Sequence, residues 1–410
     1  MNDARGTAEA VARRSYGKLV AFLAARTRDV AGAEDALSEA FAAALASWPV
    51  QGCPENPEGW LLTVARRKAL DAGRRSRTGE RAADELRIIA EKMDAPETEA
   101  GIPDRRLALL FACAHPAIEV GIRSPLMLQV VLGLDAKAIA SAFLTSPSAM
   151  SKRLVRAKEK IRQAGIPFRV PERHELPARL DAVLDAIYAA FAEGWGDPAG
   201  ADLARRDLTE EALFLARLVN ELLPDNPEAM GLLALMLHAE ARRAARRRAD
   251  GQYVPLAGQD PELWDAQMIA EAEVLLQRAS TLGSIGRFQL EAALQSAHVY
   301  RCRSGRSNWP EVVRLYDALL ALVASPVVAV NRALAIAEVD GASAGLSAMP
   351  DASSDPRLAE YQPYWAARAE LLARAGAPAE AREAYDMAIG LERDPAVRAF
   401  LQRRKAALPA

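Results

Sequence analysis

Apolar residues recur every three or four positions along almost the whole chain, which is the period of an amphipathic α-helix. We find no sustained two-residue alternation bounded by turn residues, the pattern that is typical of a β-strand. The sequence therefore predicts an all-α fold. A low aromatic content of 6% and many alanines and leucines favour the same fold class.

Clusters of proline, glycine and asparagine divide this helical pattern into blocks. We expect a first helical domain over 8–77, a second over 105–169 and a long helical domain over 178–410. The stretch 78–104 between the first two is acidic and marked by proline and glycine, so we interpret it as a linker. At about 100 to 200 residues per domain, a chain of 410 residues has room for this arrangement.

The last domain consists of Ala-rich helices separated by short breakers, a spacing that predicts a helical solenoid of antiparallel pairs. Its best repeat, WAARAELLARAGAPAEAREAYDMAIGLERDP, agrees in part with a tetratricopeptide unit, although the closing proline comes two positions late, at Pro395. Small residues would let two helices approach closely, aromatic residues would fill the groove, and a glycine would permit the turn. The residues at these positions are Ala381, Ala388, Tyr385, Trp365 and Gly376.

The segment LDAKAIASAFLTSPSAMSKRLVRAKEKIR, at 134–162, has the pattern of a helix-turn-helix. Asp135 would cap a first helix that ends near Phe143, and Ser146 with Pro147 would begin the second helix after a short turn. One face of the second helix is apolar and would pack on the first. The residues of this face are Met150, Leu154, Ala157 and Ile161.

The opposite face of this second helix presents Ser148, Lys152, Val155, Arg156 and Glu159, and the whole stretch 152–162 carries six basic residues against one acidic residue. A helix of this kind docks in the major groove with its N-terminal turns toward the base edges. Ser148, Ser151 and Lys152 would then reach bases. Arg153, Arg156, Lys158 and Lys160 suit phosphates. The alternative is a solvated basic face on an ordinary helix.

A second basic helix begins at Asn56, a capping residue, and Pro57. Trp60 near its start would stack on an unpaired base or, equally well, anchor the core. The helix before it, in AGAEDALSEAFAAALASWP, places acidic residues beside apolar ones, namely Glu34, Asp35, Glu39, Leu37, Phe41 and Leu45. Such a face would bind a protein partner, since DNA would repel it, unless it is simply an exposed amphipathic helix.

Charge is unevenly distributed, although the net charge is only −2. The first 170 residues carry 26 basic and 20 acidic side chains, and the rest of the chain carries 26 and 34. A basic front half is therefore joined to an acidic back half, and the basic half is the one that contains both basic helices.

Signatures of catalysis are absent from the sequence, which has no Gly-x-Ser-x-Gly, no Gly-Lys-Ser/Thr loop and no His-Glu-x-x-His. The three cysteines lie too far apart for a Cys-x-x-Cys pair, and structural or solvated roles are favoured for the four histidines. No segment has the apolar length of a signal peptide or a membrane span. We therefore expect a cytoplasmic protein that is not an enzyme and that has no catalytic residues, metal or cofactor.

Three segments, AEDALSEAF, GWLLTVARRKALDAGRR and the helix-turn-helix above, resemble in this order a bacterial sigma factor of the extracytoplasmic function type. Further segments, among them FACAHPAI, GRFQLEAALQSAHV and SPVVAVNRALAIAEVDG, resemble the subgroup with a long C-terminal tetratricopeptide-like extension. The resemblance covers virtually the whole chain. It implies that 8–77 is sigma region two and that 105–169 is sigma region four.

The resemblance also implies that the chain binds core RNA polymerase and promoter DNA, with a C-terminal domain that regulates or contacts a further protein or ligand. The polymerase would be contacted by Asp35, Glu39 and Phe41. The −10 element would be read and opened by Trp60, Arg66, Arg67, Lys68, Asp71, Arg74 and Arg75. The −35 element would be read by Ser148, Ser151, Lys152, Arg153, Arg156 and Lys158.

Two positions depart from the family pattern. Ser38 stands where the family usually has glutamine, which affects one polymerase contact. Gly73 stands near a usual leucine and weakens the second basic helix, because glycine costs about 1 kcal/mol in a helix interior. A helix-turn-helix regulator with a tetratricopeptide sensor, which binds operators without polymerase, is the alternative; a solenoid scaffold is a third. A plain regulator has no need of the second basic helix or of the acidic helix before it, and a solenoid scaffold would leave both basic helices unexplained.

Overall fold

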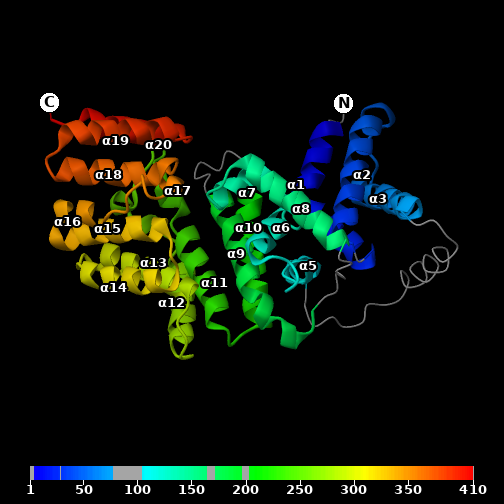
Figure 1. Ribbon diagram of the computed structural model, residues 1–410, viewed down its shortest axis with the longest axis horizontal. Helices are drawn as coiled ribbons and strands as arrows, with labels where there is room; N and C mark the ends of the chain where they lie inside the picture. Colours follow the sequence, from blue (N-terminus) through cyan, green and yellow to red (C-terminus); the bar gives the residue numbers. More distant parts are fainter. Residues whose placement is uncertain (1–3, 28, 77–103, 164–170, 196–202, 410) are drawn as a thin grey trace. The chain divides into compact units, whose positions relative to one another are not determined.

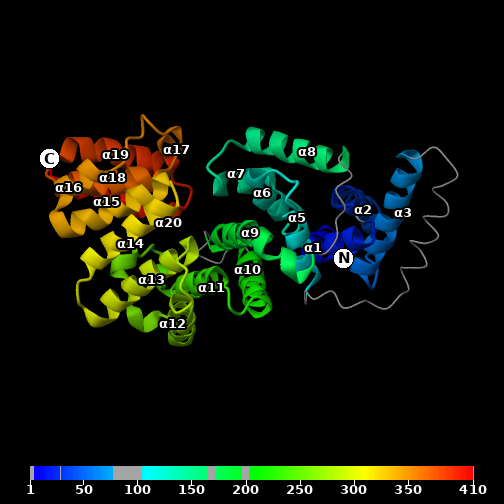
Figure 2. The ribbon, with the colours of Figure 1, turned by 60° about the horizontal axis from the view of Figure 1, so that its bottom comes forward.

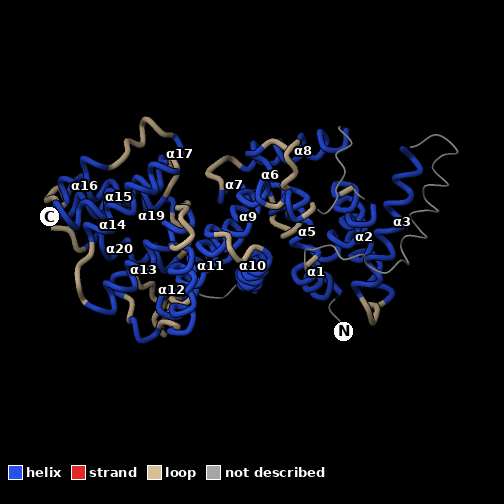
Figure 3. Tube along the Cα trace, turned by 90° about the horizontal axis from the view of Figure 1, so that it is seen from below, coloured by secondary structure: helices blue, strands red, loops and turns tan. Residues whose placement is uncertain are grey.

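The computed structural model describes residues 4–27, 29–76, 104–163, 171–195 and 203–409, and nearly all regular structure in these ranges is helical. Figure 3 draws no strand in them, and one isolated bridge joins Arg247 to Tyr253. The all-α fold that the hydrophobic pattern predicts is therefore confirmed. The linker expected over 78–104 lies outside the described residues except for Asp104.

The chain divides into two compact units, and the division falls between Leu222 and Leu223. Unit 1 begins with three helices, α1 (Ala4–Thr27), α2 (Val30–Gln51) and α3 (Pro57–Ser76), which pack on one another (Figure 1). The cap predicted for α3 is present, because Asn56 Oδ1 accepts from Gly59 N at 2.9 Å.

Four shorter helices follow in unit 1: α5 (Arg105–Cys113), α6 (Val120–Val130), α7 (Ala136–Ala142) and α8 (Pro147–Gln163). Asp104 caps α5 by accepting from Arg106 N at 2.7 Å. α8 packs on α6 and α7 (Figure 2). α1 lies so close to Val131, the residue that follows α6, that a Cβ on Gly17 would lie 1.9 Å from the Val131 carbonyl oxygen, so only glycine fits there.

Helices α9 (Pro177–Trp195) and α10 (Leu203–Leu222) complete unit 1. The sequence assigns them to the C-terminal domain, whereas in the structure they pack with the preceding helices. Ser124 of α6 donates to the Ala182 carbonyl of α9 at 3.0 Å, and Arg106 of α5 pairs with Glu211 of α10. The break in the sequence pattern near residue 178 therefore does not separate the two compact units.

Unit 2 stacks helices that follow one another along the chain (Figures 1 and 2). They are α11 (Pro227–Glu240), α12 (Ala266–Ser280), α13 (Arg287–Ser304), α14 (Trp309–Leu322), α15 (Pro326–Asp340), α16 (Ala342–Ala348), α17 (Pro356–Ala359), α18 (Gln362–Arg374), α19 (Pro378–Leu391) and α20 (Pro395–Ala406).

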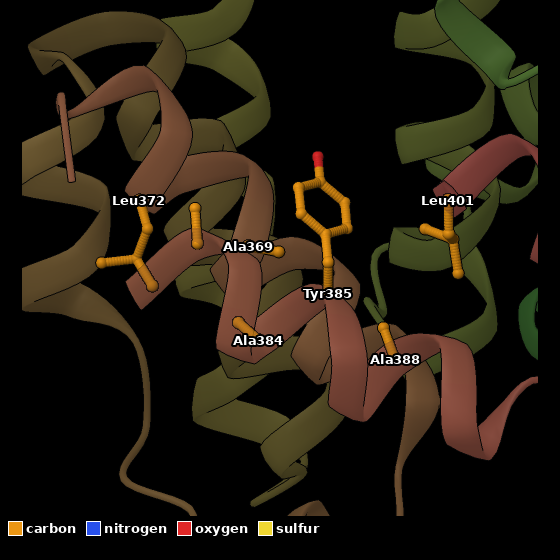
Figure 4. Packing of buried hydrophobic residues seen from close by; sticks show 7 residues of the cluster. Ala369, Leu372, Ala384, Tyr385, Ala388 and Leu401 are labelled. Carbon is orange, nitrogen blue, oxygen red and sulfur yellow. The ribbon is translucent and has the colours of Figure 1, made fainter. Parts of the chain in front are cut away.

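The pair α18 and α19 packs as the repeat in the sequence predicts (Figure 4). Ala381, Tyr385 and Ala388 are buried on α19, and Trp365 of α18 lies against the same cluster. Gly376 between the helices has a φ of +82°, a left-handed conformation that favours glycine. This packing agrees with a helical solenoid.

Candidate nucleic-acid interface

The turn between α7 and α8 is fixed by the capping residues that the sequence predicts. Asp135 Oδ1 accepts from Ala138 N at 2.7 Å, and Ser146 Oγ accepts from Ala149 N at 3.3 Å. Leu144 in the turn has a φ of +49°, which costs a residue with a side chain about 1 kcal/mol. The bond from Thr145 N to the Ala140 carbonyl, at 3.0 Å, helps to hold this geometry.

The two faces of α8 separate as the sequence predicts. Met150, Leu154 and Ile161 are buried against the other helices of unit 1, and Ala157 is half-buried. The opposite face holds exposed residues, namely Ser148, Ser151, Lys152, Val155 and Arg156. A polar and cationic surface is thus presented along the first turns of the helix, where a recognition helix contacts bases.

Two other basic residues of α8 are engaged within the chain. Arg153 Nη2 donates to the Gly121 carbonyl at 2.8 Å. Lys158 Nζ donates to Glu34 Oε2 of α2 at 2.9 Å, and Glu34 is buried. Lys158 therefore connects α8 to α2, and its contact with promoter DNA stays a prediction.

The ion pair between Lys158 and Glu34 yields a stability prediction. Lys158→Ala is expected to lower the free energy of unfolding by about 1–2 kcal/mol, since it leaves Glu34 buried and without this partner. The loss is smaller than for a fully buried pair because both side chains keep some water. Urea unfolding measures it, with exposed Lys160→Ala as the control. Equal free energies of unfolding for Lys158→Ala and Lys160→Ala would show that the ion pair between Lys158 and Glu34 does not stabilise the protein.

On α3, the residues assigned to the −10 element differ in their surroundings. Arg67 and Asp71 are exposed. Lys68 Nζ pairs with Glu39 Oε2 of α2 at 3.1 Å, and the Arg66 guanidinium lies over the Phe22 ring, 5.2 Å from its centroid. The side chains of Arg74 and Arg75 lie outside the description, although their backbone belongs to α3. Among the basic residues of this set whose side chains the structure describes, Arg67 is exposed to solvent, whereas Arg66 and Lys68 are half-buried.

Trp60 of the predicted −10 set and Phe41 of the predicted polymerase-binding set both pack within the first three helices. Trp60 is half-buried and meets Trp48 edge to face, with ring centroids 5.5 Å apart. Phe41 is half-buried and stacks on Tyr16 of α1 at 6.2 Å. The core-anchor interpretation of Trp60 agrees with this geometry, and stacking on a base would require Trp60 to expose more of its ring.

The acidic helix α2 exposes Asp35 and Glu39 but buries Glu34. Burial, with Glu34 and Asp35 nearby, raises the pKa of Tyr16 to about 12, so this phenol stays neutral at physiological pH. Sequence reasoning missed Tyr16 and the role of Glu34 as a buried ion-pair partner. No signal in the local sequence distinguishes Glu34 from its exposed neighbour Asp35.

Other kinds of site find no support in the part of the chain that the structure describes. No group of three or more His, Cys, Asp or Glu side chains in those residues is arranged to hold a metal ion. None of the described helices combines the length and apolar character needed to span a bilayer.

Comparisons with known proteins assign two segments of the chain. Residues 11–78 match the family Sigma-70 region 2, and residues 179–280 match a family of unknown function, DUF6596. An uncharacterized protein of Rhizobium meliloti (strain 1021), R00370, is 37% identical over 377 residues, which is 90% of this chain and 88% of that protein. No solved structure matches the chain.

Proposed function

We propose that this chain, which belongs to the same family as the Rhizobium meliloti protein, is a sigma factor of the extracytoplasmic function type that binds core RNA polymerase and directs it to specific promoters. The match to Sigma-70 region 2 covers most of α1 and all of α2 and α3, and it supports a sigma factor role in transcription initiation. That match is the observation that carries the proposal.

In this proposal α8 reads the −35 element and α3 serves the −10 element. The exposed face of α8 supports the first role, because hydroxyl groups and cations of that kind contact base edges and phosphates. Arg67 supports the second, since an exposed guanidinium binds the backbone of a separated strand. Asp35 and Glu39 on α2 offer acidic groups for the polymerase. Unit 2 then regulates initiation or contacts a further partner.

The alternative proposal is an operator-binding regulator that acts without polymerase. A regulator of that class has no need of a region 2, which the first three helices match. In vitro transcription with purified core RNA polymerase on a genomic library separates the two proposals. A sigma factor yields promoter-specific transcripts that vanish when the protein is omitted, whereas an operator-binding regulator yields none from core polymerase alone.

The exposed face of α8 gives the sharper test of the proposed interface. The double variant Lys152→Ala, Arg156→Ala is expected to bind a −35 duplex about 100-fold more weakly, since each base-reading or phosphate-binding side chain is worth about 1–3 kcal/mol. The salt dependence of binding should also fall, by about 0.9 in the logarithmic slope for each phosphate that the variant no longer neutralises. Fluorescence anisotropy of the holoenzyme on labelled promoter DNA measures both quantities.

A matched control removes two exposed arginines of unit 2, in the double variant Arg248→Ala, Arg306→Ala. This control loses the same charge as the α8 variant, so it corrects for a general loss of attraction to DNA. Wild-type affinity in the α8 variant, or an equal loss in the control, would show that α8 is not the −35-reading surface.

A further inference from the structure

Unit 2 contains a group of basic side chains that the proposed function does not use. It consists of His238 in the last turn of α11, Arg242 two residues after the end of α11, and His298 and Arg301 on α13. We call these four residues the basic cluster. Helices α11 and α13 pack directly on each other, and the surrounding half of the chain is acidic overall.

Arg242 is the most deeply buried cation of the basic cluster, with 6% of its surface exposed. Its Nε donates to the His238 carbonyl at 3.1 Å, and Nη2 donates to the side-chain oxygen of Gln295. Burial lowers the pKa of the guanidinium to about 10, so the group is still charged at neutral pH. Two of its five N–H donors are thus used, and both are used on neutral oxygens.

Arg301 is held rigidly in the same region. Its guanidinium lies over the Trp309 ring, 3.8 Å from the centroid, and Nη1 donates to Asn308 Oδ1 at 3.1 Å. Asn308 is itself buried and fixed, because its Nδ2 donates to the Ala297 carbonyl at 2.7 Å. Such preorganisation reduces the entropy that a ligand must remove on binding.

Both imidazoles of the basic cluster are neutral at physiological pH. Burial, together with Arg242 and Arg303, lowers the pKa of His238 to about 4. Burial, together with Arg301 and Arg242, lowers the pKa of His298 to about 3. His298 Nδ1 accepts from Arg301, so its proton is on Nε2, which is a hydrogen-bond donor.

The charge of the two arginines is not neutralised within the described part of the chain. No carboxylate there lies within ion-pair distance of Arg242 or Arg301, and both guanidinium groups have their pKa lowered by burial. The acids nearby are engaged by other residues. Glu273 faces His238 and Ser296, and Glu338, whose charge also acts on Arg301, forms its ion pair with Arg374. Buried charges in proteins are normally paired, so the buried charge of Arg242 favours an external counterion.

We propose that the basic cluster binds a small anion that carries a carboxylate or phosphate group, and that unit 2 thereby senses an anionic metabolite. Arg242 and Arg301 neutralise the anion, and the Nε2–H of His298 donates to it. The burial of Arg242 limits the ligand to a small group, because a nucleic-acid backbone or an acidic helix cannot reach a side chain so deeply enclosed. The inference holds whether or not the chain is a sigma factor.

The test uses the full chain with inorganic phosphate and citrate as probes, each replacing chloride at constant ionic strength. Thermal unfolding and isothermal titration calorimetry are expected to show that the probe raises the Tm and binds wild-type protein at one site per chain. Arg242→Gln and Arg301→Gln should each weaken binding about tenfold or more, since a lost charged hydrogen bond is worth at least that factor.

Arg248→Gln is the matched control, because Arg248 belongs to the same arginine-rich stretch but is exposed. It should bind the probe like the wild type. Circular dichroism checks the fold of each variant, and Arg301→Gln keeps the test valid if Arg242→Gln does not fold, because Arg301 is only half-buried. The proposal is overturned if neither probe has a specific effect on the wild-type protein. It is also overturned if a probe binds and stabilises Arg301→Gln as strongly as it does the wild type.

Discussion

Replacement of Arg179 by methionine is expected to lower the free energy of unfolding of unit 1 by about 3 kcal/mol. Arg179 on α9 is 2% exposed. Its Nη1 donates to the Phe111 carbonyl in the last turn of α5 at 3.1 Å, and Nη2 donates to Glu175 Oε1 at 3.0 Å. Methionine fills a similar volume but donates nothing, so the Phe111 carbonyl and Glu175 Oε1 lose this donor.

The exposed Arg173→Met, six positions earlier, is the control for this prediction, because it removes the same charge without touching the buried bonds. Urea unfolding gives the free energy of each variant. Hydrogen exchange followed by mass spectrometry then shows whether protection is lost in α5 and α9 rather than in unit 2. A difference between the two variants below about 0.5 kcal/mol would show that Arg179 does not join the two helices.

What the sequence predicts well here is local. Asn56, Asp135 and Ser146 each cap a helix by accepting from the backbone N–H three residues ahead, so their roles depend on neighbours that the sequence displays. The buried face of α8 likewise follows from a period of 3.6 residues, because Met150 and Leu154 must lie on one side of the helix.

What the sequence does not predict depends on long-range packing. Lys158 and Glu34 are 124 positions apart, and Arg179 meets a carbonyl 68 positions away. The residue pattern along the chain does not show which distant residues pair. For this reason the sequence pattern assigns α9 and α10 to the C-terminal domain, although they lie in unit 1.

Burial of charge is equally hidden from the sequence. Arg242 and Arg248 belong to one stretch, EARRAARRRADG, yet the first is enclosed and the second is exposed. Arg66 and Arg67 are neighbours on α3, but 100° of helix rotation places Arg66 over Phe22 and leaves Arg67 exposed. A set of basic residues read from the sequence therefore has to be divided by structure into residues free to bind DNA and residues that support the fold.

The close approach of α11 and α13 depends on Gly231. A Cβ at this position would lie 2.5 Å from Gln289 N and 2.8 Å from the Phe288 carbonyl carbon, both backbone atoms that cannot rotate away. The carboxylate of Glu228 holds the same segment, accepting from Phe288 N at 2.9 Å and from Gln289 N at 3.1 Å. Gly231→Ala must therefore separate the two helices, and we expect it to destabilise unit 2 by about 3 kcal/mol.

Gly390→Ala is the matched control, because this glycine also lies inside a helix but nothing stands within 4 Å of its added Cβ. There the substitution should raise stability by about 0.5–1 kcal/mol, since alanine restricts the unfolded chain more than glycine does. A lower free energy of unfolding in Gly231→Ala and a higher one in Gly390→Ala, both from urea unfolding, would separate the effect of packing from that of helix propensity.

Because α11 and α13 also place Arg242 and Arg301, Gly231→Ala should weaken phosphate binding as well, whereas Gly390→Ala should leave it unchanged. A Gly231→Ala protein with wild-type stability would mean that the two helices are not in backbone contact.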